Sequence, residues 1–305
     1  MTTETTFIGL MRAIATNPAA RGLADDVAIL ELGDHTLVLT QDMMVEGVHW
    51  LSDADPEDVA WKLVSVNLSD LAAKGAEPLG MMLSFMLGED EWDQRFAQGL
   101  SVVLKHYNVP LIGGDTVGNP EGKRSISMTA IGAATHKPVP SRSGAKPGDA
   151  LYVTGTLGDA KAGFDVILSG DDGFDELRCA FNRPLGLIAE GKKLAPHVTA
   201  MMDISDGLLI DARHMAAASN VAIAIDLSKV PTSESYQSLY GNDNNARILA
   251  SSWGDDYQLL FAAPPDAVLP VAATKIGLIE EGSGISLHDG SRPIELPQQL
   301  GFEHR

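Results

Sequence analysis

The sequence is poor in cysteine, with Cys179 alone among 305 residues. Internal disulfides and zinc sites built from several cysteines are therefore excluded, and the composition favours a reducing compartment such as the cytoplasm. No run of about twenty apolar residues occurs, so we expect no membrane span. The first residues, MTTETTFIGL, lack the basic and apolar segments of a secretory signal, which again favours a cytoplasmic protein.

Basic residues are also scarce, because 22 Lys and Arg stand against 41 Asp and Glu, a formal net charge of -19. Nucleic acid is therefore not an expected partner, since binding it requires a basic surface. The length and the 45% content of hydrophobic residues are typical of a globular protein with two domains or one large one. The excess acid either keeps the protein in solution or binds cations.

Three common nucleotide-binding motifs are missing: the GxxxxGK[ST] phosphate loop, the HRD and DFG pair of protein kinases, and the GxGxxG fingerprint. Any phosphate must therefore be bound by other elements. The candidates are GGDT at 113–116, the turn SRSGAKPG with Arg142, and the helix start at Ser205 and Asp206. An arginine in a loop is usually only solvated, so Arg142 depends on its setting.

The pattern of apolar residues predicts mixed α and β structure in two halves. In the first half we expect helices at 6–16, 55–75 and 89–108, a hairpin at 27–40, a buried strand at 81–87, and strands at 109–114 and 125–135. The Gly- and Ser-rich segment 141–149 predicts a boundary between domains 1–140 and 141–305. In the second half we expect strands at 150–155, 201–205 and 221–227, helices at 158–168, 175–184, 185–195 and 205–219, and a second α+β unit completed by 256–264 and 273–282.

The helix that begins at Asp55 and Pro56 carries two polar strips on an otherwise apolar surface. The first strip, which we expect to face water, comprises Asp58, Lys62, Ser65 and Ser69. The second comprises Asn67, Asp70 and Lys74. A second strip on a largely buried helix indicates a functional site, although one wide solvent-exposed face is the simpler alternative.

Seven acids lie beside apolar runs, mostly at predicted strand ends or helix starts: Asp25, Asp26, Asp42, Asp70, Asp115, Asp203 and Asp206. Singly, Asp115 could form a turn, and Ser205 or Asp206 could cap a helix. If the acids converge, two charges 4 Å apart repel by about 4 kcal/mol at an effective dielectric near 20. The cluster would then need cations, and oxygen ligands without thiolates favour Mg²⁺, with Mn²⁺ and Ca²⁺ as alternatives.

Several motifs, taken in order, resemble the thiamine-monophosphate kinase family of the aminoimidazole ribonucleotide synthetase-like superfamily. They are DDVAIL, TQDMMVEGVHW, VNLSDLAAKGAEP, LIGGDT, SRSGAKPGD, DISDGLLID, GDDYQLLF and GFEH. The resemblance implies ATP-dependent phosphorylation of thiamine monophosphate to thiamine diphosphate, with several Mg²⁺ ions. It also implies an α/β fold of α+β type, with an N-terminal α/β domain whose strands pair across a homodimer and a C-terminal α+β domain.

The resemblance also implies roles for individual residues. Metal ligands are expected at Asp25, Thr40, Gln41 (through its backbone), Asp42, Asp70, Asp115, Asp203 and Asp206. ATP contacts are expected at Gly114, Asp115, Arg142 and Ser205. Thiamine-phosphate contacts are expected at His49, Asp255 and Phe302. Without the resemblance, His49 is an ordinary loop histidine and Phe302 an aromatic residue packed on the core.

The sequence departs from the family pattern at four places. TQD replaces TTD, GGDTVGN replaces GGDTTRG and so lacks an arginine, GDD replaces GED at Asp255, and Lys74 replaces a common apolar residue. Other members of the superfamily fit less well. A selenophosphate synthetase needs a reactive residue near the N-terminus and a hydrogenase-maturation protein a C-terminal cysteine, whereas VNLSDLAAKGAEP and GFEH disfavour an amidine-forming purine enzyme. A non-catalytic nucleotide- or cation-binding protein stays open.

The expected reaction needs no general base, and no obvious His–Asp or Ser–His nucleophile pair is present in the sequence. A phosphate monoester has a second pKa near 6, so the acceptor is already ionised at neutral pH. The difficulty is to bring two polyanions together, which bound cations overcome. We therefore expect direct in-line transfer without a phosphoenzyme.

Overall fold

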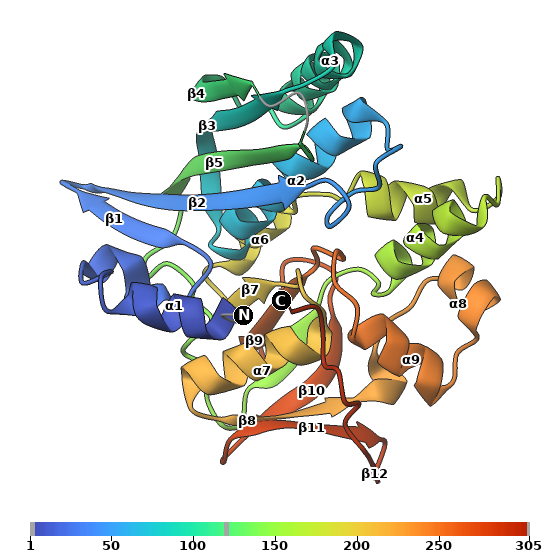
Figure 1. The fold of residues 1–305 in the computed structure, drawn as a ribbon. Helices are drawn as coiled ribbons and strands as arrows, with labels where there is room; N and C mark the ends of the chain where they lie inside the picture. Colours follow the sequence, from blue (N-terminus) through green and yellow to red (C-terminus); the bar gives the residue numbers. More distant parts are fainter. Residues whose placement is uncertain (1–3, 119–121, 304–305) are drawn as a thin grey trace.

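The computed structural model describes residues 4–118 and 122–303. The chain forms two sheets, stacked one above the other in Figure 1 and joined by helices that lie between them. Mixed helices and strands in two halves were predicted from the sequence. Among the described residues, no helix is both long enough and apolar enough to cross a membrane.

The N-terminal sheet has the strand order β1-β2-β5-β3-β4. Its strands are β1 (Ala28–Leu32), β2 (His35–Val45), β3 (Ala76–Leu87), β4 (Leu111–Gly118) and β5 (Ser125–Ala134). Pairing is antiparallel except between β3 and β4. Helices α2 (Pro56–Ala73) and α3 (Asp90–His106) pack together on one face of this sheet. The helix α1 (Glu4–Arg12) and the 3-10 helix η1 (Pro18–Leu23) precede β1.

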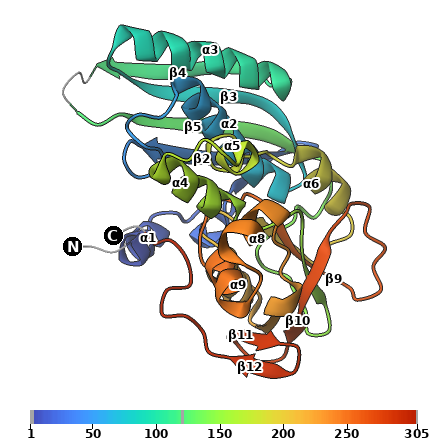
Figure 2. The same ribbon diagram turned by 90° about the vertical axis from the view of Figure 1, so that its right-hand side faces the viewer.

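The C-terminal sheet has the order β12-β11-β8-β10-β6-β9-β7. Its strands are β6 (Ala150–Val153), β7 (Ala200–Asp203), β8 (Ala222–Asp226), β9 (Leu259–Ala263), β10 (Thr274–Glu280), β11 (Gly284–Asp289) and β12 (Arg292–Ile294). The helices of this half are α4 (Asp159–Ser169), α5 (Asp175–Asn182), α6 (Ile188–Leu194), α7 (Leu208–Ser219), α8 (Glu234–Tyr240) and α9 (Asn244–Ser251), with the 3-10 helix η2 (Leu227–Lys229). Figure 2 shows α4, α5 and α6 at the junction of the two domains.

The predicted hairpin and the predicted long helices are confirmed, including Asp55 as the residue that caps α2 by accepting a hydrogen bond from the Glu57 N–H. The elements α8, α9, β11 and β12 were not predicted. The prediction of a buried strand at 81–87 is wrong in part. Met82 of β3 is 42% exposed, because no element in the described part of the chain covers its face of the sheet, and Leu87 at the end of the strand is 45% exposed.

Helix α2 is buried on nearly all sides, so the prediction that its first polar strip faces water is wrong. The C-terminal domain covers that strip and pairs with its polar groups. The Lys62 Nζ donates to Asp255 at 2.8 Å, and the Ser69 Oγ donates to Asp203 at 2.6 Å. The last turn of α2 adds Ala72 and Ala73 to an apolar cluster that includes Phe261 of the C-terminal sheet. Helix α2 therefore belongs to both domains.

The contact between α2 and α6 depends on the absence of a side chain at Gly191. A Cβ atom at Gly191 would lie 1.9 Å from the carbonyl oxygen of Ala72, which belongs to the backbone and cannot move aside. We expect Gly191→Ala to lower the free energy of unfolding by roughly 1 to 3 kcal/mol, the usual range for overpacking. Thermal unfolding would show this as a melting temperature lower by several degrees.

Gly9→Ala is the matched control, because Gly9 also lies in a helix and a Cβ there has open space. We expect that variant to melt at or slightly above the wild-type temperature, since alanine favours a helix. Equal stability of Gly191→Ala and the wild type would contradict the close packing of the two helices.

Candidate active site at the domain junction

A cavity of about 480 Å³ lies between the two domains. Strand β2 and helix α2 line it from the N-terminal side, and the end of β7, the turn after it and the segment 252–257 line it from the C-terminal side. Its acidic members are Asp26, Asp42, Asp70, Asp203, Asp206 and Asp255. Its aromatic members include Phe164, Phe181, Trp253, Tyr257 and Phe302. The cavity therefore combines an acidic part with an aromatic part.

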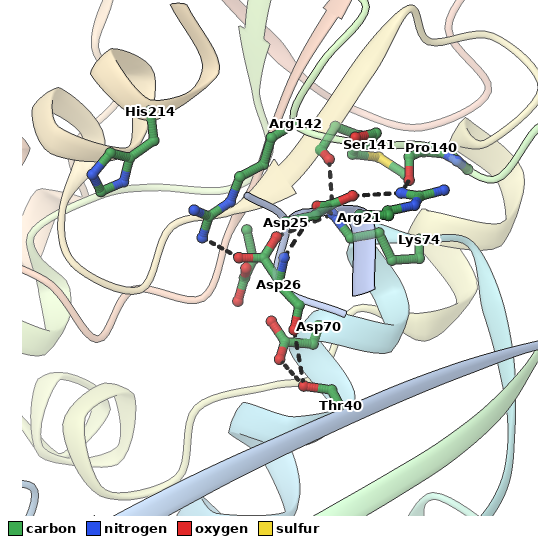
Figure 3. A network of polar contacts seen from close by, with 12 residues as sticks. Arg21, Asp25, Asp26, Thr40, Asp70, Lys74, Pro140, Ser141, Arg142 and His214 are labelled. Carbon is green, nitrogen blue, oxygen red and sulfur yellow. Dashed lines mark hydrogen bonds and ion pairs between the residues drawn. The ribbon is translucent and has the colours of Figure 1, made fainter. Parts of the chain in front are cut away.

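The acids are brought together by β2, α2 and β7 and by the segment before β1, which carries Asp26. In β2 the side chains alternate, so Thr40 and Asp42 point to the α2 side together with the buried Val38 and Met44. Asp70 comes from the second polar strip of α2, and Asp203 is the last residue of β7. Carboxylate oxygens of Asp26, Asp70 and Asp203 all lie within 4.8 Å of one another. Figure 3 shows Asp26 and Asp70 facing each other, with Thr40 donating to Asp70.

Burial and mutual repulsion disfavour the charged forms of three of these carboxylates. The pKa of Asp70 is raised well above its usual value, by burial first and then by Asp42 and Asp203. Burial and Asp26 raise the pKa of Asp42 to about 6 and that of Asp203 to about 7. In the described part of the chain, the buried Asp42 Oδ2 has no hydrogen-bond partner. Carboxylate oxygens are hard donors of the kind that suits Mg²⁺, and a bound cation would favour their charged forms.

Protein cations stabilise the acids on the opposite side of the cluster. Burial alone would raise the pKa of Asp26, but the charges of Lys74 and Arg142 outweigh it, and the pKa is lowered. Arg142 donates directly to Asp26, so its guanidinium lies at the acidic part of the cavity (Figure 3). Asp25 is also predominantly ionised, because Lys74 and Arg21 outweigh burial and lower its pKa. Asp25 lies behind Asp26 and does not line the cavity.

Ser205 and Asp206, predicted to contact ATP and metal, line the cavity from the turn between β7 and α7. This turn is held by Asp211, whose Oδ2 accepts the backbone N–H groups of Asp206 at 3.2 Å and Gly207 at 3.1 Å. The sequence reasoning missed Asp211. The available signal was an acid in the first turn of the helix that follows DISDG, where it can accept unpaired N–H groups.

His49, Asp255 and Phe302, the three residues predicted to contact thiamine phosphate, all line the cavity. The His49 Nδ1 accepts the backbone N–H of Val45 at 3.0 Å, which fixes the imidazole ring. Asp255 is fixed by the Lys62 Nζ at 2.8 Å and by the hydroxyl of Tyr257 at 2.9 Å. Asp255 is one methylene shorter than the glutamate of the family pattern. Both of its carboxylate oxygens accept hydrogen bonds from protein donors.

The aromatic part of the cavity was not predicted. The Phe164 ring lies 5.3 Å from the Phe181 ring and 5.5 Å from the Trp253 ring, measured between centroids. These residues come from α4, α5 and the segment after α9. No local sequence pattern relates the three segments, so only the tertiary fold reveals the aromatic wall.

Gly114 and Asp115 do not line this cavity. They lie in β4, at the edge of the N-terminal sheet, where every residue is exposed. The register places Met43, Ser127, Ser84 and Asp115 in one row across the four strands β2, β5, β3 and β4. Met43 also lines the cavity, so this row runs from the cavity across the open face of the sheet. Asp115, where an ATP contact was predicted, is therefore separated from the other predicted site residues within one chain.

Family models match both halves of the chain. Residues 24–134 match the model described as AIR synthase related protein, N-terminal domain, and residues 146–289 match the model of the C-terminal domain. Each match contains one of the two sheets, apart from β12, which follows the second match. The two halves therefore form the two-domain aminoimidazole ribonucleotide synthetase-like fold that the sequence predicted.

Similar proteins share the whole arrangement. Thiamine-monophosphate kinase of Haemophilus influenzae is 36% identical over 302 residues, which cover 92% of this chain and 90% of the relative. The solved structure of AaThiL complexed with AMPPCP and TMP has a TM-score of 0.89 at 33% identity and covers 99% of this chain and 97% of its own. Thiamine monophosphate kinase from Aquifex aeolicus gives a TM-score of 0.83, also at 33% identity, with 96% and 98% covered. This chain belongs to the thiamine-monophosphate kinase family.

Proposed function

We propose that this protein transfers the terminal phosphoryl group of ATP to thiamine monophosphate and so forms thiamine diphosphate. The observation that carries the proposal is a single cavity with an acidic part and an aromatic part. Relatives named thiamine-monophosphate kinase and a similar structure complexed with AMPPCP and TMP support it. The single cysteine is in keeping with a cytoplasmic location.

Asp26, Asp42, Asp70 and Asp203 are the residues that would hold Mg²⁺, with Asp206 beside them at the turn before α7. Bound Mg²⁺ supplies positive charge that offsets the repulsion between two phosphorylated substrates and stabilises the charge on the transferring group. The chain contributes crowded carboxylates whose pKa values are raised by burial first and by repulsion between neighbouring acids second, and a bound cation would offset both effects. Thr40 orients one of them by donating its hydroxyl to Asp70.

Arg142 and Ser205 are suited to the phosphates of ATP. The turn before α7 carries Ser205 into the cavity, and Asp211 holds this turn in place. Arg142 is anchored by Asp26 and has a buried Nε without a partner among the described residues. A guanidinium with an unused donor can bind a phosphate oxygen while it stays within reach of the acids.

The acceptor end of the cavity is formed by His49, Asp255 and the aromatic wall. Thiamine carries a cationic thiazolium and a flat pyrimidine ring, and Phe302 or Trp253 can stack on such groups. His49 is fixed by its hydrogen bond from Val45 and can donate from its other ring nitrogen to the acceptor phosphate. These residues position the acceptor for direct in-line transfer, and no general base is required.

We further propose that the protein works as a homodimer in which the open face of the N-terminal sheet meets a second copy. Met43, Met82 and Val117 are 57%, 42% and 57% exposed on strands that alternate toward this face. Such an apolar face is typical of a protein interface. Asp115 lies on the same face, so the second copy would bring its β4 near the cavity and complete the expected ATP site.

The activity test compares two acceptors in the presence of ATP and Mg²⁺, with release of ADP as the measurement. We expect turnover with thiamine monophosphate and at least a hundredfold less with thiamine. The hydroxyl of thiamine needs a base, whose contribution is about 10² to 10⁴ in rate, whereas a phosphate oxygen is already ionised. Comparable rates with both acceptors would contradict the mechanism without a base, and no turnover with either would favour a non-catalytic binding protein.

The dimer test places a charge on the open sheet face. Val117→Asp should convert the dimer into a monomer, because a carboxylate would be buried against apolar residues of the second copy. Light scattering after size-exclusion chromatography measures the mass in solution. Val102→Asp is the control, since Val102 is similarly exposed, at 55%, but lies on α3. A monomeric wild type, or equal behaviour of the two variants, would show that this face is not the interface.

A further inference from the structure

Lys74 is a buried charge at the centre of the acidic region. It follows the last residue of α2, and its side chain is fully shielded from solvent. Its Nζ lies 2.6 Å from the Asp25 Oδ1, 3.0 Å from the Asp26 Oδ2 and 3.4 Å from the carbonyl oxygen of Met201. An ammonium group has three protons, and each therefore has an acceptor. The charge of Lys74 is therefore balanced by two carboxylates, and its hydrogen-bonding capacity is filled.

The contacts of Lys74 divide the acids into two groups. The Asp25 Oδ1 accepts from Lys74 and from the Asp26 backbone N–H at 3.1 Å, and its Oδ2 accepts from Arg21. Arg21 is itself tied to the carbonyl oxygens of Val139 and Pro140 at 3.1 and 3.0 Å. Both oxygens of Asp25 therefore have cationic partners, as Figure 3 shows.

The acids on the other side of the cluster have few donors. Asp70 accepts from the neutral hydroxyl of Thr40, and Asp203 accepts from the neutral hydroxyl of Ser69 at 2.6 Å. The Asp42 Oδ2 has no partner among the described residues. Asp26 lies between the two groups, since it contacts Lys74 and also belongs to the cluster with Asp70 and Asp203. Lysine and arginine side chains therefore contact Asp25 and Asp26 directly, and among the described residues these contacts extend no further into the cluster.

We infer that the Lys74 ammonium takes the place of one divalent cation in this chain and that Asp25 binds Lys74 and Arg21 in place of a metal ion. Divalent ions then bind on the far side of Asp26, to Asp42, Asp70 and Asp203. The inference rests on the proposed Mg²⁺-dependent phosphoryl transfer, and it assigns Lys74 and Asp25 a role that the resemblance to the family did not supply. Its consequence is a smaller number of bound ions than the acids alone would allow.

The experiment counts Mn²⁺ ions, as a spectroscopic substitute for Mg²⁺, bound in the presence of a non-hydrolysable ATP analogue. Electron paramagnetic resonance of the unbound ion gives the stoichiometry. Lys74→Met should bind one ion more than the wild type, because Asp25 and one oxygen of Asp26 lose their ammonium partner. The double variant Lys74→Met with Asp25→Asn should return to the wild-type number.

Lys62→Met is the matched control, because Lys62 is also a buried lysine of α2 but pairs with Asp255. It should leave the number of Mn²⁺ ions unchanged. Without divalent ions, Lys74→Met should melt several degrees below the wild type, and Mn²⁺ should restore more of its stability than it adds to the wild type. If Lys74→Met does not fold, Asp25→Asn in the wild-type background decides, and it should keep the wild-type number of ions.

The outcomes separate this inference from the proposed function. Equal numbers of bound ions in the wild type and in Lys74→Met would overturn the role of Lys74 and leave the proposed function standing. Loss of an ion in Asp25→Asn would do the same. If the wild type binds no Mn²⁺ with the nucleotide analogue, the proposed metal-assisted transfer is wrong, and the inference falls with it.

Discussion

Carboxylates from the segment before β1, from α2 and from β7 lie within 4.8 Å of one another at the junction of the two domains, and the contacts around them depend on this crowding. Two charges at such a distance repel by several kcal/mol, so the arrangement is stable only if cations balance it or protons neutralise it. The protein meets part of this need itself through Lys74, Arg21 and Arg142. The remaining carboxylates, with raised pKa values, form the part of the site that a ligand must complete.

Helix α2 makes this arrangement possible because it is shared by both domains. Its apolar stripe packs in the N-terminal core, whereas its first polar strip holds the C-terminal domain through Lys62 and Ser69. Its second polar strip supplies Asp70 and Lys74 to the acidic region. One helix between the domains thus carries Asp70, a proposed metal ligand, and Lys62, which holds Asp255 at the proposed acceptor end. The glycine contact at Gly191 keeps α6 close enough for this packing.

The sequence predicted much of this account, and the reasons differ from residue to residue. Asp26, Asp70 and Asp203 could be chosen because several acids lie beside apolar runs and together indicate a common site, and the structure brings these three together. The aromatic wall of Phe164, Phe181 and Trp253 could not be predicted, since it exists only where three distant segments meet. The first polar strip of α2 was misassigned because polar residues on a helix normally indicate solvent, and helical periodicity does not reveal that a second domain covers it. The partners of Lys74 could not be predicted either. The only indication was that a lysine replaces an apolar residue of the family pattern at this position.

We propose that the crowded carboxylates bind cations together with nucleotide, and thermal unfolding of Asp70→Asn beside the wild type measures this coupling. Ligands that bind only the folded state add about 2.7 kcal/mol at a hundredfold excess over Kd. Mg²⁺ with a non-hydrolysable ATP analogue should raise the wild-type melting temperature by several degrees and more than the sum of either alone. Without ligands, Asp70→Asn should melt at or above the wild type, because one repelling charge is gone, and with both ligands it should gain little. Asp266→Asn removes the same charge from an exposed position and should respond like the wild type. A shift in Asp70→Asn equal to the wild-type shift, or a wild-type shift reproduced by NaCl at the same ionic strength, would contradict the account.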